Sequence, residues 1–109
     1  MLAITQLDTV ELLTKATNSN KVVEIVYRPG RRRIQPHVLG LSKDRNCLLR
    51  AYQIEGASES GEHINWKLFR VDKIEAIEIT DETFDADHPD YNPDDRVMKG
   101  GIIARVRKV

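Results

Sequence analysis

The change of periodicity at Lys21 constrains the fold of this chain more than any other feature. Before Lys21, apolar residues recur at helical spacing, and after it they alternate with polar residues as on half-buried strands. Turn residues separate five short segments of this second kind, which we expect to be strands over 21–27, 32–41, 47–55, 64–71 and 74–80. One helix followed by five short strands predicts a mainly β domain, built as a small five-stranded barrel.

The N-terminal segment predicts one short helix over 9–17. Asp8 followed by Glu11 has the form of a capping pair, and apolar residues then recur on one helical face. The polar residues 18–20 compete with the backbone for hydrogen bonds, so we expect them to end the helix.

Proline marks two positions in the strand region. Pro29 and Gly30 form a turn dipeptide, which predicts a hairpin between the first two strands. Pro36 lies inside the second strand and cannot donate a hydrogen bond to a neighbour, so it indicates an edge, a bulge or a bend. In a small barrel, such a bend lets one strand serve two sheets.

The character of the chain changes after Thr80. Residues 81–95 combine acidic side chains with two prolines and two apolar anchors, Phe84 and Tyr91, and predict a loop or an arm. Alternation after residue 101 predicts a terminal strand that pairs with its own domain or with a neighbour. We therefore expect one domain, with a helix and barrel over 1–80 and an acidic arm with a terminal strand over 81–109.

Charge is segregated along the chain, although the formal net charge is zero. Between 27 and 50 only Asp44 opposes a set of cations formed by Arg28, Arg31, Arg32, Arg33, Lys43, Arg45 and Arg50. The following stretch to residue 95 is dominated by Asp and Glu. In a small protein this segregation suggests a cationic site for an anionic ligand rather than a uniformly solvated surface.

Several classes of protein are not indicated. With 109 residues the chain makes one domain, and its single cysteine, Cys47, excludes an internal disulfide framework. No apolar stretch is long enough to span a bilayer and no signal-like segment is present, so we expect a cytoplasmic protein without a membrane partner.

Chemical motifs are weak. His37, His63, His88 and Cys47 form no pair with ligand spacing, and the Asp-rich loop around Pro89 lacks the glycine and final Glu of a calcium loop. No phosphate loop or local catalytic grouping stands out. We expect no metal, no cofactor and no enzymatic activity.

Four segments resemble the WYL-domain family over about 21–80. In that family a Tyr closes the first strand, an Arg precedes a Pro in the second, a Trp-Tyr-Leu triplet opens the third, and a Phe-Arg-Leu-Asp-Arg-Ile-like segment ends the domain. The matching segments here are Ile25-Val26-Tyr27, Arg32-Arg33-Ile34-Gln35-Pro36-His37-Val38-Leu39, Leu48-Leu49-Arg50-Ala51-Tyr52 and Phe69-Arg70-Val71-Asp72-Lys73-Ile74. The naming triplet is replaced by Cys47-Leu48-Leu49, in which only the Leu matches.

The resemblance implies an Sm-like or SH3-like barrel with a regulatory role. Such domains usually follow a winged helix-turn-helix in bacterial transcription regulators, or accompany phage-defence components, and sense ligands or bind nucleic acid. Here the N-terminal segment has room for one helix, so we expect a stand-alone module. The implied ligand-facing residues are Tyr27, Arg33, Arg50 and Arg70, with His37 and Tyr52 nearby.

The residues themselves do not decide whether these arginines bind a ligand or pair with carboxylates of their own chain. Arg50 interrupts an apolar strand and Arg70 ends another, so each charge must reach a ligand, solvent or a carboxylate such as that of Asp72. The run Arg31, Arg32 and Arg33 either tracks a phosphate backbone or forms a solvated edge.

Trp66 leaves a similar choice. The only Trp of the chain is either a core residue, whose indole N–H finds a partner, or an exposed platform for stacking.

The leading hypothesis is a non-enzymatic regulatory module that binds an anionic ligand, nucleic acid or a nucleotide. Arginines would hold phosphate and Tyr27 would stack on a base. The alternative is a homo-oligomerisation or protein-interaction domain, in which the acidic arm 81–95 docks on the arginine-rich hairpin of a neighbouring chain.

Overall fold

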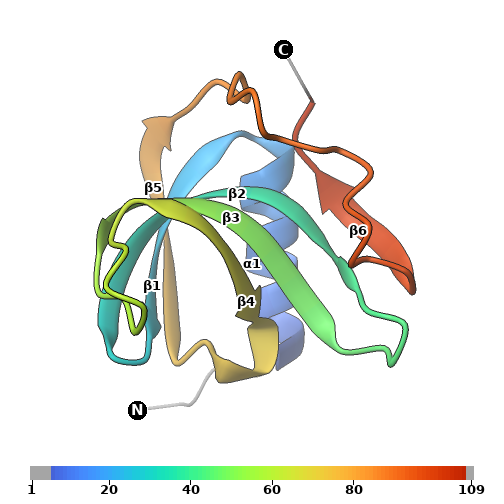
Figure 1. Ribbon diagram of the computed structural model, residues 1–109, viewed down its shortest axis with the longest axis horizontal. Coiled ribbons are helices and arrows are strands. Elements are labelled where there is room, and N and C mark those ends of the chain that lie inside the picture. Colours follow the sequence, from blue (N-terminus) through green and yellow to red (C-terminus); the bar gives the residue numbers. More distant parts are fainter. Residues whose placement is uncertain (1–5, 108–109) are drawn as a thin grey trace.

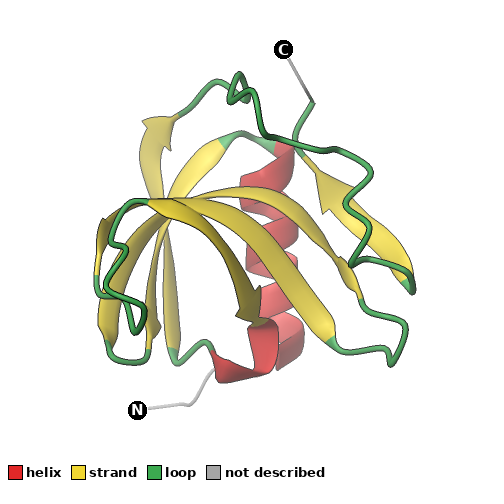
Figure 2. Cartoon of the chain, viewed as in Figure 1, coloured by secondary structure: helices red, strands yellow, loops and turns green. Residues whose placement is uncertain are grey.

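The computed structural model describes residues 6–107 and shows a mainly β fold with one helix (Figures 1 and 2). The sheet has six strands, and each pairing in it is antiparallel. The elements follow in the order α1 (Gln6–Asn18), β1 (Lys21–Tyr27), β2 (Gly30–Leu41), β3 (Cys47–Gly56), β4 (Asn65–Arg70), the 3₁₀ turn η1 (Val71–Lys73), β5 (Ala76–Thr83) and β6 (Gly101–Arg105).

Helix α1 confirms the expected N-terminal helix and extends beyond the predicted bounds at both ends. Asp8 lies in its first turn rather than before it, so its expected capping position is wrong. A carboxylate in the first turn still favours the helix, because it faces the positive end of the helix dipole. The helix ends as predicted near residue 18, and Asn20 follows it with a positive φ of 52°.

Strand β2 connects the two parts of the sheet. Its N-terminal half pairs with β1, its C-terminal half pairs with β6, and β3 runs along most of its length. The β2–β3 register shifts between Pro36 and Val38, so the bulge or bend expected from Pro36 is confirmed. The expected C-terminal strand is also confirmed, and it pairs with β2 of its own chain.

The expected closure into a five-stranded barrel is not confirmed. The pairing order is β4-β3-β2-β1-β5, and no pairing between β4 and β5 closes the sheet within residues 6–107. The two edge strands are connected through η1, whose residues follow a 3₁₀ turn instead of continuing a strand. The sheet is therefore bent but open.

Both faces of the bent sheet are covered. One cluster packs α1 against the sheet through residues such as Leu13, Ile25 and Leu49. A second cluster joins the sheet to the segment between β5 and β6, and it contains Val22, Val38, Leu48, Phe84, Ala86, Tyr91, Met98 and Val106. Since adjacent residues of a strand point to opposite faces, Leu48 and Leu49 contribute to different clusters. In Figure 1, α1 lies behind the sheet, and the segment before β6 passes over the top and right side of the sheet.

Candidate ligand-binding groove

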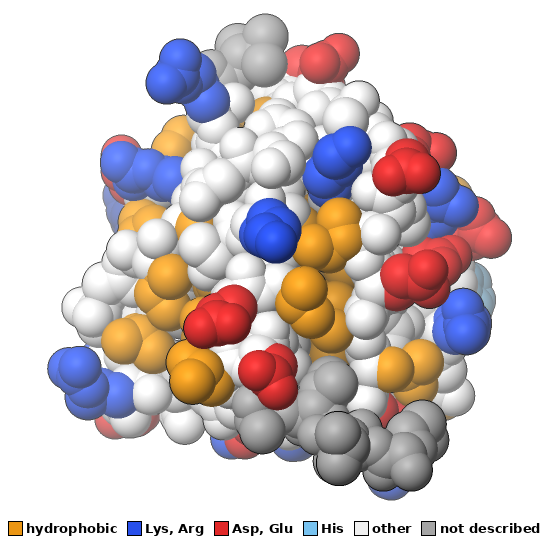
Figure 3. Space-filling model, turned by 180° about the vertical axis from the view of Figure 1, so that it is seen from behind, with side chains coloured by type: hydrophobic (Ala, Val, Ile, Leu, Met, Phe, Trp, Pro, Cys, Tyr) orange, Lys and Arg blue, Asp and Glu red, His pale blue; other side chains and the backbone are white. Residues whose placement is uncertain are grey.

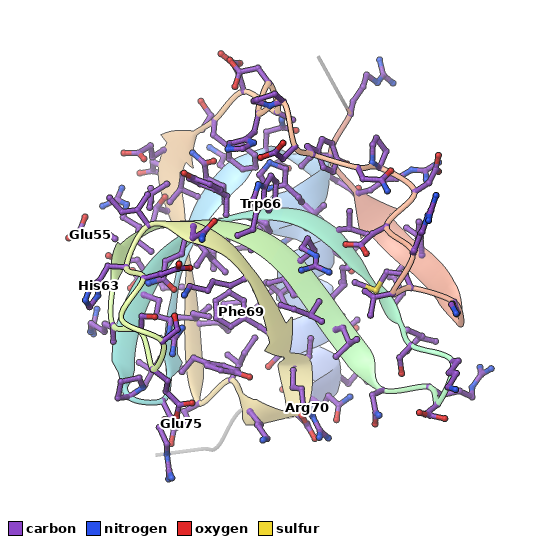
Figure 4. All side chains as sticks on the ribbon, viewed as in Figure 1. Glu55, His63, Trp66, Phe69, Arg70 and Glu75 are labelled. Carbon is purple, nitrogen blue, oxygen red and sulfur yellow. The ribbon has the colours of Figure 1, made fainter. Side chains whose placement is uncertain are left out.

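Tyr27 and Arg70, two residues implied by the family resemblance, lie side by side. The Tyr27 ring packs edge-on against Phe69 with 4.8 Å between centroids, and its hydroxyl accepts a hydrogen bond from the Arg70 backbone N–H at 3.2 Å. The Arg70 side chain turns to Asp72 and donates two hydrogen bonds of 3.1 and 2.8 Å to its carboxylate. Figure 4 shows Phe69 inside the bent sheet and Arg70 at the end of β4.

Arg33 and Arg50 lie elsewhere and are also paired. Arg33 donates to Glu82 at 2.9 Å, and Arg50 donates to Asp95 at 2.8 Å. The Asp95 side chain is only 12% exposed, so the second pair is well shielded from solvent. The structure therefore does not gather the four implied residues, and it gives each of the three arginines a carboxylate from its own chain.

His37 and Tyr52 belong to an aromatic cluster on the face of the sheet that is covered by the acidic arm 81–95, called the acidic segment below. His37 is 1% exposed and its Nδ1–H donates to the Gln35 carbonyl at 2.7 Å. Burial lowers the pKa of His37 to about 4, the Gln35 bond opposes this shift, and nearby His88 adds to it. A residue this deeply buried serves packing and does not line a surface site.

Trp66 is part of the same aromatic cluster. Its ring lies 4.7 Å from that of His37 and 5.3 Å from that of Tyr52, and it packs against the second apolar cluster. The expected hydrogen-bond partner is missing, because the buried indole Nε1 has none within the described part of the chain. Trp66 therefore packs as in the first of the two alternatives, but within residues 6–107 its indole lacks the hydrogen-bond partner that this alternative included.

The three arginines of the hairpin have different environments. Arg31 is exposed and lies 3.9 Å from Glu24, a distance at which a solvated pair contributes little. Arg32 is only 5% exposed, and its side chain points in the same direction as Ile34, two residues further along the strand. Arg33 points the other way, toward Glu82.

Arg32 is a buried cation held by neutral groups. Its guanidinium donates to the Tyr27 carbonyl at 3.0 Å, to the Gln53 side-chain oxygen at 3.3 Å and to the Arg28 carbonyl. It also lies 5.1 Å from the centroid of the Tyr27 ring and 5.4 Å from that of Phe69. Within residues 6–107, no carboxylate oxygen lies at ion-pair distance from it.

The electrostatics of Arg32 reflect this environment. Burial lowers the pKa of its guanidinium, and the charges of Tyr27 and Glu59 act in the opposite direction. A buried positive charge with only neutral hydrogen-bond acceptors is an arrangement that an added anion would stabilise.

Two cavities share Tyr27 and Glu59 in their linings, and Arg32 lines the first of them. The first has a volume of about 270 Å³ and is further lined by Arg32, Ser58, Ser60, Lys67, Leu68 and Phe69. The second has a volume of about 530 Å³ and is further lined by Arg28, Asp72, Lys73, Ile74 and Glu75. We call the two cavities together the Tyr27 groove.

Lys67 supplies a second cation to the groove. Its Nζ donates to the Ser58 hydroxyl at 3.0 Å and to the Ser60 hydroxyl at 3.1 Å. Like Arg32, it has no carboxylate at ion-pair distance in the described residues. Lys67 was not among the residues predicted to bind a ligand, although period-two alternation places it on the same face of β4 as buried Phe69.

The loop that carries Ser58 and Ser60 is held by hydrogen bonds from side chains to backbone carbonyls. Gln53 donates to the carbonyls of Ala57 and His63 at 2.8 and 3.0 Å, and the His63 Nδ1–H donates to the Gly56 carbonyl at 2.7 Å. Gly56 has a φ of +114°, and a Cβ at this position would collide with the backbone of Arg31. His63 lies on this loop at the left edge of Figure 4.

A third cavity of about 230 Å³ lies next to the aromatic cluster. Its lining includes Arg50, Trp66, Asp90, Tyr91 and Asp95. Asp95 already neutralises Arg50 and Asp90 adds a negative charge, so this cavity is not suited to an anion.

Residues 6–107 contain no group of three or more His, Cys, Asp or Glu side chains arranged to hold a metal ion. In the same range, no helix is both long and apolar enough to cross a membrane.

Comparisons with protein-family models, with curated proteins and with solved structures found no match to this chain.

Proposed function

We propose that this protein is a non-enzymatic module that binds an anionic ligand, nucleic acid or a nucleotide, in the Tyr27 groove. The observation that carries the proposal is the buried Arg32 guanidinium, which lies at a cavity and has no carboxylate partner in the described residues. Burying an unneutralised charge is costly, and a bound phosphate would offset that cost.

Each group in the groove has a role in this proposal. The phosphate oxygens would accept hydrogen bonds from Lys67 and from the hydroxyls of Ser58 and Ser60. The positive charge of Arg32, behind these groups, would attract the phosphate further. Tyr27 lines both cavities, and its ring would contact a base. Glu59 is the one acidic residue in the first cavity and would face the sugar or solvent.

The family resemblance adds a regulatory setting to the proposal. A stand-alone WYL-like module in transcription regulation or phage defence would need a ligand site on a small bent sheet. The Tyr27 groove offers one, and it adjoins Arg70 through the Tyr27 hydroxyl. In this proposal the bent sheet is an opened form of an Sm-like or SH3-like barrel.

Lys67→Gln is the test of the site. Glutamine keeps a hydrogen-bond donor for the two serines but removes the charge, so we expect affinity for adenosine monophosphate and for single-stranded oligonucleotide to fall by about tenfold. Lys43→Gln, in the exposed turn between β2 and β3, removes the same charge far from the groove and is the matched control. Isothermal titration at low salt measures both, and equal affinities for the two variants would refute the site.

The alternative function is homo-oligomerisation or binding of a protein partner through the acidic segment. The observation that bears on it is that Glu82 and Asp95 of this segment already pair with Arg33 and Arg50 of the same chain. These charges therefore do not require a neighbouring chain. Self-association that weakens with added salt, measured by light scattering without any nucleotide, would favour this alternative.

A further inference from the structure

The Tyr27 groove has two chemically different ends. The first cavity holds the cations Arg32 and Lys67 with two serine hydroxyls. The second cavity holds two exposed carboxylates, Asp72 and Glu75. Glu59 lines both, and the second cavity also holds the cations Arg28 and Lys73. An anionic group is therefore favoured at one end, and groups that donate hydrogen bonds are favoured at the other.

Four arginines of the described residues are already paired and are not free to bind a nucleic acid backbone. Arg33, Arg50 and Arg70 each have a carboxylate oxygen within 3 Å, and Arg105 pairs with Asp94 at 3.1 Å. Figure 3 shows acidic and basic side chains interspersed on the back of the molecule, without a continuous basic stripe among the described residues. A chain of phosphates that left the first cavity through the second would meet the cations Arg28 and Lys73 but also the carboxylates of Glu59 and Glu75, while Asp72 is paired with Arg70, so the second cavity offers it no net positive charge.

The size of the groove also favours a small ligand over a polymer. The second cavity, of about 530 Å³, falls in the range of volumes that enclose a small molecule, and the first, of about 270 Å³, lies just below it. One cavity suffices for a single phosphate and the other for a planar group and its sugar.

We propose, on the basis of the proposed function, that the ligand is a small phosphate monoester joined to a planar, amino-bearing group, of the size of a nucleoside monophosphate. Its phosphate binds Lys67, Ser58 and Ser60 in front of Arg32. Its planar group lies against Tyr27, with an N–H donor directed to Glu75. The affinity of an oligonucleotide does not exceed that of its terminal nucleotide, because only that nucleotide contacts the groove.

The test compares four probes on the full chain: inorganic phosphate, ribose 5-phosphate, adenosine monophosphate, and 5′-phosphorylated oligodeoxyadenylates of increasing length. We expect adenosine monophosphate to bind about tenfold tighter than ribose 5-phosphate, because the base adds stacking and donors. We expect oligonucleotide affinity to be independent of length, with a salt slope no steeper than that of the monophosphate.

Two variants assign the ends of the groove. Lys67→Gln should weaken every probe, inorganic phosphate included. Glu75→Gln should leave inorganic phosphate and ribose 5-phosphate unchanged and weaken adenosine monophosphate about threefold, since a carboxylate accepts stronger hydrogen bonds than an amide does.

The outcomes separate this inference from the proposed function. Affinity that rises with oligonucleotide length, together with a salt slope that steepens, overturns the small-ligand inference, and a loss of that binding in Lys67→Gln would leave the groove as the site. Ribose 5-phosphate binding as tightly as adenosine monophosphate also overturns the inference. If no probe binds, or if Lys67→Gln leaves the affinities unchanged, both the small-ligand inference and the proposed function are overturned.

Discussion

His37 links the stability of the fold to pH at the level of one side chain. It is 1% exposed and lies 4.9 Å from the ring of Tyr91 and 5.2 Å from that of Phe84. Burial lowers its pKa to about 4, with a smaller contribution from His88, whereas a histidine in the unfolded chain titrates near 6.5. The native protein therefore binds this proton less readily than the unfolded chain does.

We expect His37 to destabilise the fold as pH falls from about 6.5 to about 4, by about 3 kcal/mol in the free energy of unfolding. Above that window both states hold a neutral imidazole and the effect vanishes. Urea denaturation at a series of pH values measures it, and His37→Gln should flatten the slope in this window. Ile103→Ala is the control, because this exposed side chain does not titrate, and its slope should match that of the parent. A parental slope in His37→Gln would contradict the assignment.

The local elements followed from the sequence to different degrees. The helix, the strands and the bulge at Pro36 were predicted because hydrophobic period and proline geometry act over a few residues. Phe84 and Tyr91 were identified as anchors, but the surface they cover was not, since it consists of residues distant in sequence such as Val22 and Val38. Their own spacing contains no information about that surface.

Phe84→Ala tests how firmly the acidic segment is attached. Phe84 is 8% exposed within the second apolar cluster, so its loss should leave a cavity and lower the free energy of unfolding by about 3 kcal/mol. Ile103→Ala is the matched control, because Ile103 is also apolar and C-terminal but 43% exposed, and we expect a cost below about 1 kcal/mol. Equal losses in urea denaturation would show that the segment is not packed as described.

At the scale of the whole molecule, long-range pairing decides which cations remain for a ligand. The sequence indicated an excess of arginine in one region, but the partners of Arg33 and Arg50 lie 49 and 45 residues away and could not be assigned from spacing. Arg32 could have been distinguished from its neighbours, because alternation places it on the face of Ile34. The absence of a carboxylate partner for Arg32 among the described residues could not be predicted, because it depends on the tertiary fold.

The two apolar clusters share the same strands, and this predicts that the molecule unfolds as one unit. Trp66, the only Trp, reports on the cluster under the acidic segment, whereas far-UV circular dichroism reports on α1 across the sheet. Since β2 and β3 contribute neighbouring residues to both clusters, loss of either should remove the support of the other. We expect the two signals to give one urea midpoint and one slope of about 1–3 kcal/mol/M. Phe84→Ala should move both midpoints together, whereas a fluorescence transition that precedes the loss of helix would show that the acidic segment detaches on its own.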